Sequence, residues 1–371
     1  MAAIFVIYSV DTFLVVAVAA RMWSRALLLV LVTALHAVGE SAHQDNNSNF
    51  DTQLKVGRSI DLFTRYGYLS LSMKVVPRND SVPTWIFREP TVDIFNNVDH
   101  LVRSRQAPKN VVFEGDFHME FCDNLNQLLQ AYFRDFSFEK LKRPWRAFTG
   151  SWLPEAIARN LGINSSFTHG DYCYVLVRLS RFRDRSELGR LPENVSLVEM
   201  VQKEMDGIKV GDYASVLMFI KKFGSHYIKS YVTGNSLYQV FVYKRSVYQN
   251  IKSKLQKEGV SDVDTRELLL SYFSPWYAEH MGKIKVSSGN KTVENWAQSK
   301  LRVRYYIFSY PCLLKIHGDP HLLGVLNNLL GNEALLQIKM NAISPAFKDP
   351  VKKQWFNEVL ENMLDLWEVN L

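Results

Sequence analysis

Strict alternation of apolar and polar residues marks the first strand that the sequence predicts. In the stretch VVFEGDFHMEF (residues 111–121), every second residue is apolar or glycine, and the residues between them include three acids and a histidine. A period of two is that of a strand with one buried face. Three further segments, residues 172–182, 226–242 and 301–308, are rich in β-branched and aromatic residues and also predict strands.

Apolar residues at helical spacing predict helices between these strands. Asp123 is placed to cap a helix over residues 125–133, and Asp212 to cap a helix that ends before Gly224. A third helix is expected over residues 248–255, and Asp349 is placed to cap a long C-terminal helix that begins at Pro350. Helices therefore separate strand one from strand two and strand three from strand four, which is the pattern of the α+β class.

The N-terminus has the features of a secretory signal peptide. Residues 26–38 (ALLLVLVTALHAV) are almost wholly apolar, Arg21 and Arg25 precede them, and the small residue Gly39 follows. That order is typical of a signal peptide cleaved near Gly39 and predicts a secreted, extracellular protein. The alternatives are a buried core helix and an uncleaved signal anchor, which Asp11 disfavours because it interrupts the preceding apolar stretch.

The sequence divides into three parts. Residues 1–39 are the expected N-terminal extension and signal peptide, within which Met22 offers an alternative start. Residues 40–50 (ESAHQDNNSNF) are mostly polar and predict a disordered mature N-terminus. We expect residues 51–371 to form a single domain, with a helical C-terminal part over residues 311–371.

Five sequons of the form Asn-x-Ser/Thr agree with export, and none has proline at the middle position. Such sites accept N-linked glycans in exported proteins, so we expect a glycosylated surface. The five asparagines are Asn46, Asn79, Asn164, Asn194 and Asn290.

Basic residues cluster in three segments of a chain whose formal net charge is +7. In a secreted protein, such segments suggest an anionic matrix, a glycosaminoglycan or a membrane surface as partner rather than nucleic acid, and ordinary solvated faces are the alternative. Two of the segments are residues 178–190 and 300–304. In the third segment we expect one basic patch, formed by Lys140, Lys142, Arg143 and Arg146.

A short motif indicates a protein family. It consists of Phe223, Gly224, Ser225, His226 and Tyr227, followed after six residues by Gly234. The motif resembles the signature of the membrane-attack-complex/perforin (MACPF) family, in which an aromatic residue, Gly, Thr, His and an aromatic residue precede two glycines. The resemblance implies the fold shared with cholesterol-dependent cytolysins: a bent, four-stranded antiparallel sheet, a helical cluster in each of two strand connections, and C-terminal helices.

Three positions depart from the family pattern. Ser225 replaces Thr, Val216 stands where Tyr is usual, and Asn235 replaces the second glycine. Asparagine visits left-handed conformations more easily than most residues but carries a Cβ. The substitution at Asn235 therefore brings into question the bending and opening of the sheet that pore-forming relatives need.

The sequence has three cysteines, Cys122, Cys173 and Cys312. If strands one and two are antiparallel neighbours, as the resemblance implies, Cys122 at the end of one strand and Cys173 at the start of the other lie at the same end of the sheet. We expect a disulfide between them, with Cys312 unpaired; the alternative is three free buried thiols.

The sequence has no pattern typical of an enzyme, a metal site or a cofactor site. It lacks a nucleophile elbow, a phosphate-binding glycine loop and a zinc-protease helix. His226 is expected to be a structural, hydrogen-bonding residue. We therefore expect a non-enzymatic protein without cofactor, whose family resemblance implies extracellular protein partners, a receptor or a ligand.

The resemblance also implies an alternative function, membrane perforation. In killing members of the family the two helical clusters unfurl into membrane-crossing hairpins, each strand of which needs about 9 to 11 residues with an alternating apolar face. Residues 124–140 and 245–259 have no such band, and only residues 268–278 come close. Asn164 and Asn290 fall within the two segments that would insert. The sequence thus predicts a signalling protein that does not perforate membranes.

Overall fold

The computed structural model describes residues 51–63, 76–79, 82–106, 115–144, 153–258, 272–305, 307–317, 319–330 and 334–369, which belong to one compact unit. The predicted signal peptide and disordered N-terminus, residues 1–50, lie outside the described residues, as do Asn46 and Arg146.

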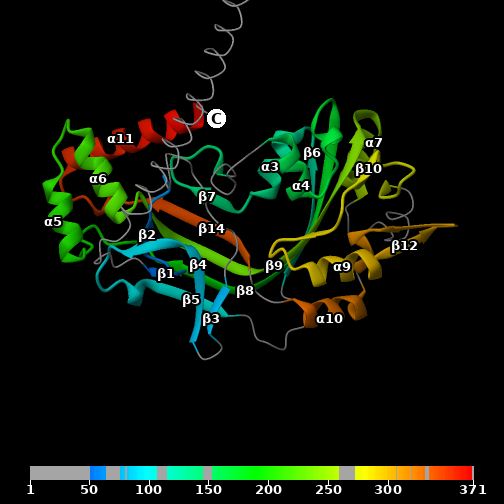
Figure 1. The fold of residues 1–371 in the computed structure, drawn as a ribbon, viewed down its shortest axis with the longest axis horizontal. Helices are drawn as coiled ribbons and strands as arrows, with labels where there is room; N and C mark the ends of the chain where they lie inside the picture. The colour runs from blue at the N-terminus through cyan, green and yellow to red at the C-terminus, as the bar shows by residue number, and fades with distance from the viewer. Residues whose placement is uncertain are drawn as a thin grey trace, which may run out of the picture. The chain divides into compact units, whose positions relative to one another are not determined.

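Two long antiparallel strands form the centre of the sheet. They are β8 (Tyr172–Leu188) and β9 (His226–Lys244), whose register runs from Tyr172 opposite Lys244 to Glu187 opposite Ser230. On one side β6 (Gly115–Cys122) pairs with β8, and on the other side β14 (Ala334–Ala342) pairs with β9, both antiparallel. Figure 1 shows the long strands curving along their length. The α+β class and a bent antiparallel sheet built on four main strands are therefore confirmed.

Eight further strands widen this core to a sheet of twelve strands within the described residues. Strands β6 and β5 pair with successive parts of the same edge of β8. Strand β7 pairs in parallel with β14. Strand β2 pairs with the start of β9, and β10 and β11 pair with its far end. These further strands are β1 (Asp51–Gln53), β2 (Arg58–Ile60), β3 (Val76–Asn79), β4 (Val82–Asp93), β5 (Val102–Gln106), β7 (Phe136–Phe138), β10 (His280–Met281) and β11 (Lys285–Val286).

Helices occupy two of the strand connections, as the sequence predicts. We call the described residues between β6 and β8 the first cluster, and those between β9 and β14 the second cluster. The first cluster contains α3 (Leu125–Tyr132), α4 (Pro154–Leu161) and η3 (Ser165–Thr168). The second contains α7 (Arg245–Glu258), α9 (Lys291–Lys300), η5 (Leu313–Ile316) and α10 (Pro320–Leu329).

The other helices gather around the beginning of β9. As predicted, the side chain of Asp212 caps α6 by accepting a hydrogen bond from Ala214 N. The side chain of Asp349 accepts a hydrogen bond from Val351 N at the start of α11, also as predicted. Phe219 of α6 packs edge-to-face on Phe356 of α11. These helices and turns are η1 (Asp99–Leu101), α5 (Glu199–Gly207), α6 (Tyr213–Phe223), η6 (Ser344–Ala346) and α11 (Pro350–Val369).

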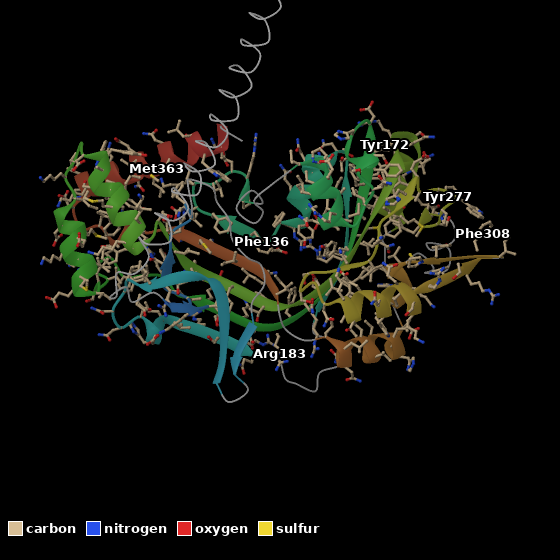
Figure 2. The ribbon with its side chains drawn as sticks, viewed as in Figure 1. Phe136, Tyr172, Arg183, Tyr277, Phe308 and Met363 are labelled. Carbon is tan, nitrogen blue, oxygen red and sulfur yellow. The ribbon has the colours of Figure 1, made fainter. Side chains whose placement is uncertain are left out.

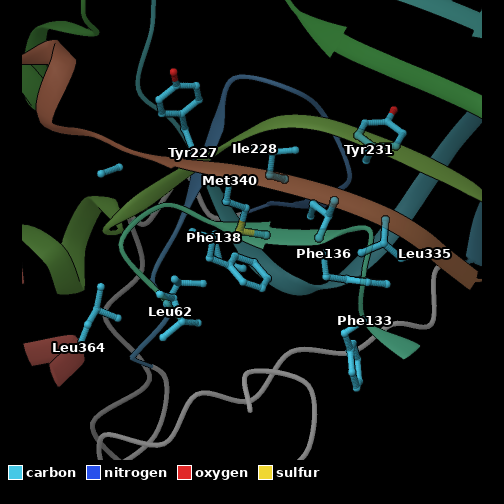
Figure 3. Packing of buried hydrophobic residues seen from close by; sticks show 14 of the residues in the cluster. Leu62, Phe133, Phe136, Phe138, Tyr227, Ile228, Tyr231, Leu335, Met340 and Leu364 are labelled. Carbon is cyan, nitrogen blue, oxygen red and sulfur yellow. The ribbon is translucent and has the colours of Figure 1, made fainter. Parts of the chain in front are cut away.

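The period of two along the long strands divides the interior into two cores. On β8, Tyr174 and Leu176 belong to the larger core, which also contains residues of α3 and α11. Val175 and Val177, on the opposite face, belong to a second core with residues of the second cluster. Figure 3 shows part of the larger core, where β7, β9 and β14 pack together.

Three local predictions were wrong. Residues 301–308 do not form the fourth main strand: β12 (Arg302–Tyr305) and β13 (Phe308–Pro311) make a separate hairpin, and β14 takes that place in the sheet. Because β14 falls within residues 311–371, that part is not wholly helical. Asn124 rather than Asp123 caps α3, since its side chain accepts from Gln127 N.

Candidate functional site

The signature residues lie where α6 ends and β9 begins. Gly224 follows the last residue of α6, Phe223, with φ of 85°. A Cβ at this position would lie 2.7 Å from the backbone carbonyl of Ile60 in β2. Both the left-handed backbone and the close approach of β2 therefore require glycine here.

Ser225 fastens this junction to two other segments through its backbone and its side chain. Its amide donates to Ile60 O (2.9 Å), and its carbonyl accepts from Ile343 N (3.1 Å). Its hydroxyl accepts from Leu62 N at 3.3 Å. The last of these contacts needs a hydroxyl group, which Ser and Thr both carry. Ser can therefore replace the Thr of the family pattern.

His226 continues the same network into the first cluster. Its Nε2 lies 2.9 Å from Glu139 O and its Nδ1 lies 3.0 Å from Ser225 Oγ. Because a carbonyl only accepts, Nε2 carries the proton, and Nδ1 accepts from the Ser225 hydroxyl. Burial lowers the pKa of His226 to about 4, so the ring is neutral. The histidine is thus a fully buried connection between β9 and the first cluster, as a structural residue would be.

Gly234 lies where the two long strands are irregular. Phe182 of β8 faces Gly234 but Asp184 faces Thr233, so Arg183 is an extra residue that bulges from β8 (Figure 2). A Cβ on Gly234 would lie 2.0 Å from Arg181 O. The glycine therefore permits the close approach of the two strands at the bend.

Asn235, which replaces the second glycine of the signature, is buried and bonded to the second cluster. Its Nδ2 donates to Ser288 Oγ (3.0 Å), and its Oδ1 accepts from Ser287 Oγ (3.1 Å). The amide of Ser236 donates to the same Oδ1 at 3.0 Å. The sheet bends here although Asn235 carries a Cβ, and the asparagine attaches the turn before α9 to β9.

Gln239 makes a second buried attachment between β9 and the second cluster. Its Nε2 donates to Gly282 O (2.8 Å) and to Pro311 O (3.1 Å), and its Oε1 accepts from Leu313 N (2.8 Å). The side chain is fully buried. One glutamine thus satisfies three backbone groups from two separate segments of the second cluster, a role that the sequence pattern did not reveal.

The two clusters also contact each other. Lys283 N donates to Gly162 O at 2.8 Å, and Asn164 N donates to His280 Nε2 at 3.2 Å. The His280 ring stacks on Phe167 with a centroid distance of 4.9 Å. These contacts join the end of α4 in the first cluster to β10 and the following turn in the second.

Arg178 attaches the first cluster to the sheet. Its guanidinium is buried, donates to Tyr132 O (2.7 Å) at the end of α3, and lies 5.0 Å from the centre of the Tyr132 ring. A cation at the C-terminal end of a helix is favourably placed relative to the helix dipole. Arg178 lines a small cavity at the bend together with Ser236 of β9 and Ser287 of the second cluster.

The predicted basic patch is largely neutralised by the acidic side of α11. Lys140 pairs with Glu361, and Lys142 Nζ lies 3.7 Å from Asp365. Glu368 accepts from the backbone amides of Lys142 and Arg143, at 3.0 Å each. Two of the expected cations, Lys140 and Lys142, are therefore paired with carboxylates of a helix more than 200 residues away in sequence, and a role of the patch in binding stays a prediction.

Three of the sequon asparagines, Asn164, Asn194 and Asn290, lie at exposed or partly exposed sites. Asn164 caps η3 and Asn290 caps α9, each through its Oδ1 atom, and this leaves the Nδ2 atom, to which a glycan is attached, outside the cap. Asn194 is exposed in a turn, and Asn79 is the last residue of β3. Glycosylation of these asparagines stays a prediction.

The predicted disulfide between Cys122 and Cys173 is absent, and all three thiols are free and buried. Cys122 is opposite Tyr174, so its side chain shares the face of Tyr174, whereas Cys173, one residue earlier, points to the opposite face. Burial raises the pKa of Cys122 and of Cys312 to about 12, and it also raises the pKa of Cys173. None of the three thiols is thus activated as a nucleophile.

The hairpin β12–β13 carries exposed apolar residues that the sequence analysis assigned to the main sheet. Phe308 and the neighbouring Ile307 are exposed, and the Phe308 ring packs edge-to-face on exposed Trp276 with a centroid distance of 5.1 Å. Tyr277 is exposed beside Trp276, and Figure 2 shows Tyr277 and Phe308 at the same end of the molecule. The sequence signal for this site is the run of aromatic and apolar residues that follows the basic residues Arg302 and Arg304.

Two further kinds of feature, a metal site and a membrane-spanning helix, are absent from the described residues. No group of three or more His, Cys, Asp or Glu side chains there is arranged to hold a metal ion. None of the helices in the same residues combines the length and the apolarity that crossing a bilayer requires.

Comparisons with known proteins find similarity at the level of solved structures. No protein-family model matches the sequence, and no curated protein matches it. GNIP1Aa from Chromobacterium piscinae is 8% identical over 85% of this chain and 57% of its own, with a TM-score of 0.45. A protein from Bacteroides thetaiotaomicron described as a cell invasion protein with a MAC/Perforin domain is 9% identical over 86% of this chain and 63% of its own, with a TM-score of 0.41.

Astrotactin-2, a vertebrate perforin-like membrane protein involved in neuronal development, is 14% identical over 83% of this chain and 96% of its own, with a TM-score of 0.33. The chain spans about three fifths of the length of the first two proteins. The structures similar to this one thus include MACPF/perforin-like proteins.

Proposed function

We propose that the protein is a secreted, non-enzymatic signalling protein with a MACPF-like fold, which acts through its folded surface and forms no pore. The observation that carries this proposal is the attachment of the second cluster to β9 by two buried amides, Asn235 and Gln239. Unfurling the second cluster would break these hydrogen bonds and leave buried backbone groups unsatisfied, which is costly.

Contacts of the first cluster support the same proposal. Its carbonyl at Gly162 is bonded to Lys283 of the second cluster, and Asp123 pairs with Lys252 of α7 at 3.2 Å. A membrane-crossing strand would also have to bury charged side chains such as Lys252 in hydrocarbon, and glycans at Asn164 and Asn290 would oppose insertion.

The partners that we propose follow from the resemblance of the sequence to Torso-like, the MACPF family member associated with terminal patterning of the embryo. That resemblance implies a protein that promotes local activation of the receptor tyrosine kinase Torso together with its ligand Trunk. It further implies that the protein is held in the eggshell or extracellular matrix.

The alternative is a membrane-perforating effector. The segment that comes closest to an alternating apolar band, residues 268–278, is described from residue 272 onward, and there Trp276 and Tyr277 are exposed while Ala278 is buried. This arrangement keeps aromatic side chains in solvent, which a perforating protein could use for insertion.

Purified mature protein tests the two functions together. It would be assayed for receptor activation on cells carrying the receptor and ligand, and for dye release from liposomes at the same concentrations. We expect receptor activation without dye release. An Asn164→Gln/Asn290→Gln variant is the matched control, because it removes any restraint that glycans impose on insertion. Dye release by either form at signalling concentrations would support the perforating alternative.

A further inference from the structure

A positive charge is buried at the bend of the sheet without a full set of partners. Arg178 of β8 is only 7% exposed. Its Nη2 atom donates to Tyr132 O, and its guanidinium lies beside the Tyr132 ring. Its Nε atom is buried and has no hydrogen-bond partner within the described residues. A buried charge is costly unless it is paired and hydrogen-bonded, so this guanidinium indicates a further binding partner.

The nearest carboxylates do not neutralise this charge by direct contact. Burial lowers the pKa of Arg178, and Glu120 and Asp135 are near enough to oppose that shift through their charge. Both carboxylates pair with Arg134 instead, at 3.0 and 3.3 Å, and Glu120 also lies 3.2 Å from His118. Their negative charge is thus shared with another arginine, and part of the charge of Arg178 stays uncompensated.

A small cavity lies next to this guanidinium. It is lined by Arg178 and Ser236 of the long strands, by Ser287 of the second cluster and by Phe136 of β7, which lies near the bend of the long strands (Figure 2). The volume of the cavity is about 20 Å³. One water molecule needs about 10 to 15 Å³ measured in this way. The cavity therefore has room for one guest of the size of a water molecule or a chloride ion, and it excludes a sulfated sugar or a phosphate ester.

The groups that line the cavity suit an anion better than a water molecule. Arg178 offers only N–H donors, and the Ser236 hydroxyl can donate as well. The Ser287 hydroxyl accepts from Ser236 N (3.0 Å) and donates to Asn235 Oδ1 (3.1 Å), so its own proton is already used. The lining side chains from β7 and β14 are apolar. A water molecule needs acceptors for its two protons, whereas an anion needs only donors and also neutralises the buried charge.

We propose that this cavity is a binding site for one small monovalent anion of the size of chloride, held by Arg178 and Ser236. The site lies where the end of α3, the strands β7 and β14, the bend of β9 and the turn before α9 meet. A bound anion neutralises the buried cation and holds both clusters against the sheet. The proposal does not depend on the proposed signalling function, because binding requires only the folded protein and the anion.

Thermal unfolding of the mature protein tests this site when sodium chloride replaces sodium gluconate stepwise at constant ionic strength, because gluconate is too large for the cavity. We expect chloride to raise the melting temperature of the wild type in a saturable way, as a ligand of the folded state does. Ser236→Ala should raise the chloride concentration at half-saturation about tenfold, the value of one hydrogen bond to an ion. Arg178→Gln should abolish the chloride effect. Arg181→Gln is the matched control on the same strand, since Arg181 donates to Asn327 O and does not line the cavity, and it should keep the effect.

Crystals of the wild-type protein grown in bromide locate the anion directly. We expect one anomalous bromide peak in the cavity, within hydrogen-bond distance of Arg178 Nε. Density there without an anomalous signal would identify a water molecule and overturn the proposal. Equal melting temperatures in chloride and gluconate would overturn it as well, and so would a chloride effect that Ser236→Ala leaves unchanged, because the anion would then bind elsewhere. If Arg178→Gln does not fold, Ser236→Ala and the bromide map still decide the question.

Discussion

The two clusters occupy comparable connections of one sheet but are attached to it by different chemistry. The first cluster is bonded through Glu139 O to the titratable side chain of His226, and next to it Lys140 pairs with Glu361 of α11. The second cluster is held by the neutral, buried amides of Asn235 and Gln239. Acid and salt should therefore loosen the first attachment and leave the second unchanged.

The surfaces of the two clusters differ in a related way. Basic residues of the first cluster face the acidic side of α11, while those of the hairpin in the second cluster face solvent. A run of basic residues in a sequence thus becomes a positive surface only where the fold brings no carboxylates to it. We therefore propose the second cluster, rather than the first, as the interaction surface of the protein.

The largest effect is expected from Gln239→Leu, which removes three buried hydrogen bonds between β9 and the second cluster. Each unsatisfied buried backbone group costs about 1 to 3 kcal/mol, so the free energy of unfolding should fall by about 3 to 5 kcal/mol. Urea unfolding measures this change.

Gln127→Leu is the matched control in the first cluster. Its side chain accepts one hydrogen bond, from Asp123 N, at the surface, so we expect a loss below about 1 kcal/mol. Equal losses for the two variants would show that the second cluster is not specially held by Gln239.

His226 should make stability depend on pH. Its pKa is about 4 in the folded protein and about 6.5 when unfolded, so the unfolded chain binds more protons between these values. The free energy of unfolding therefore falls as pH drops from about 6.5 to 4, by about 3 kcal/mol from this residue. Hydrogen exchange should rise first near Glu139 in the first cluster, and not near Gln239.

Asp61 should change the free energy of unfolding with pH in the opposite direction to His226, so the two contributions have to be measured separately. Burial raises the pKa of Asp61 to about 6, so the folded protein binds the extra proton between about pH 4 and 6 and gains stability as the pH falls. We expect Asp61→Asn to steepen the acid dependence and His226→Asn to flatten it. An acid dependence that His226→Asn leaves unchanged would rule out the histidine as its source.

Asn235→Ala should loosen the second cluster at one turn. It removes the bonds to Ser287 and Ser288 and should cost about 1 to 2 kcal/mol. Hydrogen exchange should increase over residues 284–290 and stay constant in the first cluster. Asn235→Gly, which restores the glycine of the family signature, should behave in the same way; unchanged exchange in both variants would contradict the proposed attachment.

The smallest effect is expected from reversing Lys140 and Lys142 to Glu. Both cations pair at the surface with carboxylates of α11, and such pairs are worth at most about 1 kcal/mol. Heparin binding should change little compared with Lys300→Glu/Arg304→Glu. A larger loss of heparin binding from the Lys140/Lys142 variant would restore the basic patch that the sequence suggested.

Local patterns predicted most of the elements that position these attachments. The period of two identified β6, the content of β-branched and aromatic residues identified β8, and the caps at Asp212 and Asp349 marked α6 and α11 correctly. Glycine at positions 224 and 234 was recognised by the motif, and the structure gives its reason, the approach of another backbone.

Long-range features could not be read from the sequence. Residues 334–342 (ALLQIKMNA) contain good helix formers, and only pairing with β9 makes them a strand. The cysteine prediction failed on a register difference of a single residue, which decides the face of the sheet. The burial of Asn235 and Gln239 depends on segments about 40 to 75 residues further along the chain, which no local period records.

The central claim is that the protein signals with its second cluster attached to the sheet. Ser236 and Ser287 continue the register in which Lys285 is opposite Tyr238 and Val286 opposite Leu237, and Ser287 N donates to Ser236 O at 2.9 Å. Facing residues of this kind have Cβ atoms about 4.5 to 5.5 Å apart, near the separation in a disulfide. A Ser236→Cys/Ser287→Cys variant can therefore be oxidised to lock the cluster in place.

Receptor activation by this variant, measured before and after reduction and beside each single-cysteine variant, tests the claim most directly. We predict that the locked protein activates the receptor as well as the reduced protein does. A locked protein that is inactive and recovers on reduction would contradict the claim, because it would show that the second cluster must leave the sheet for the protein to act.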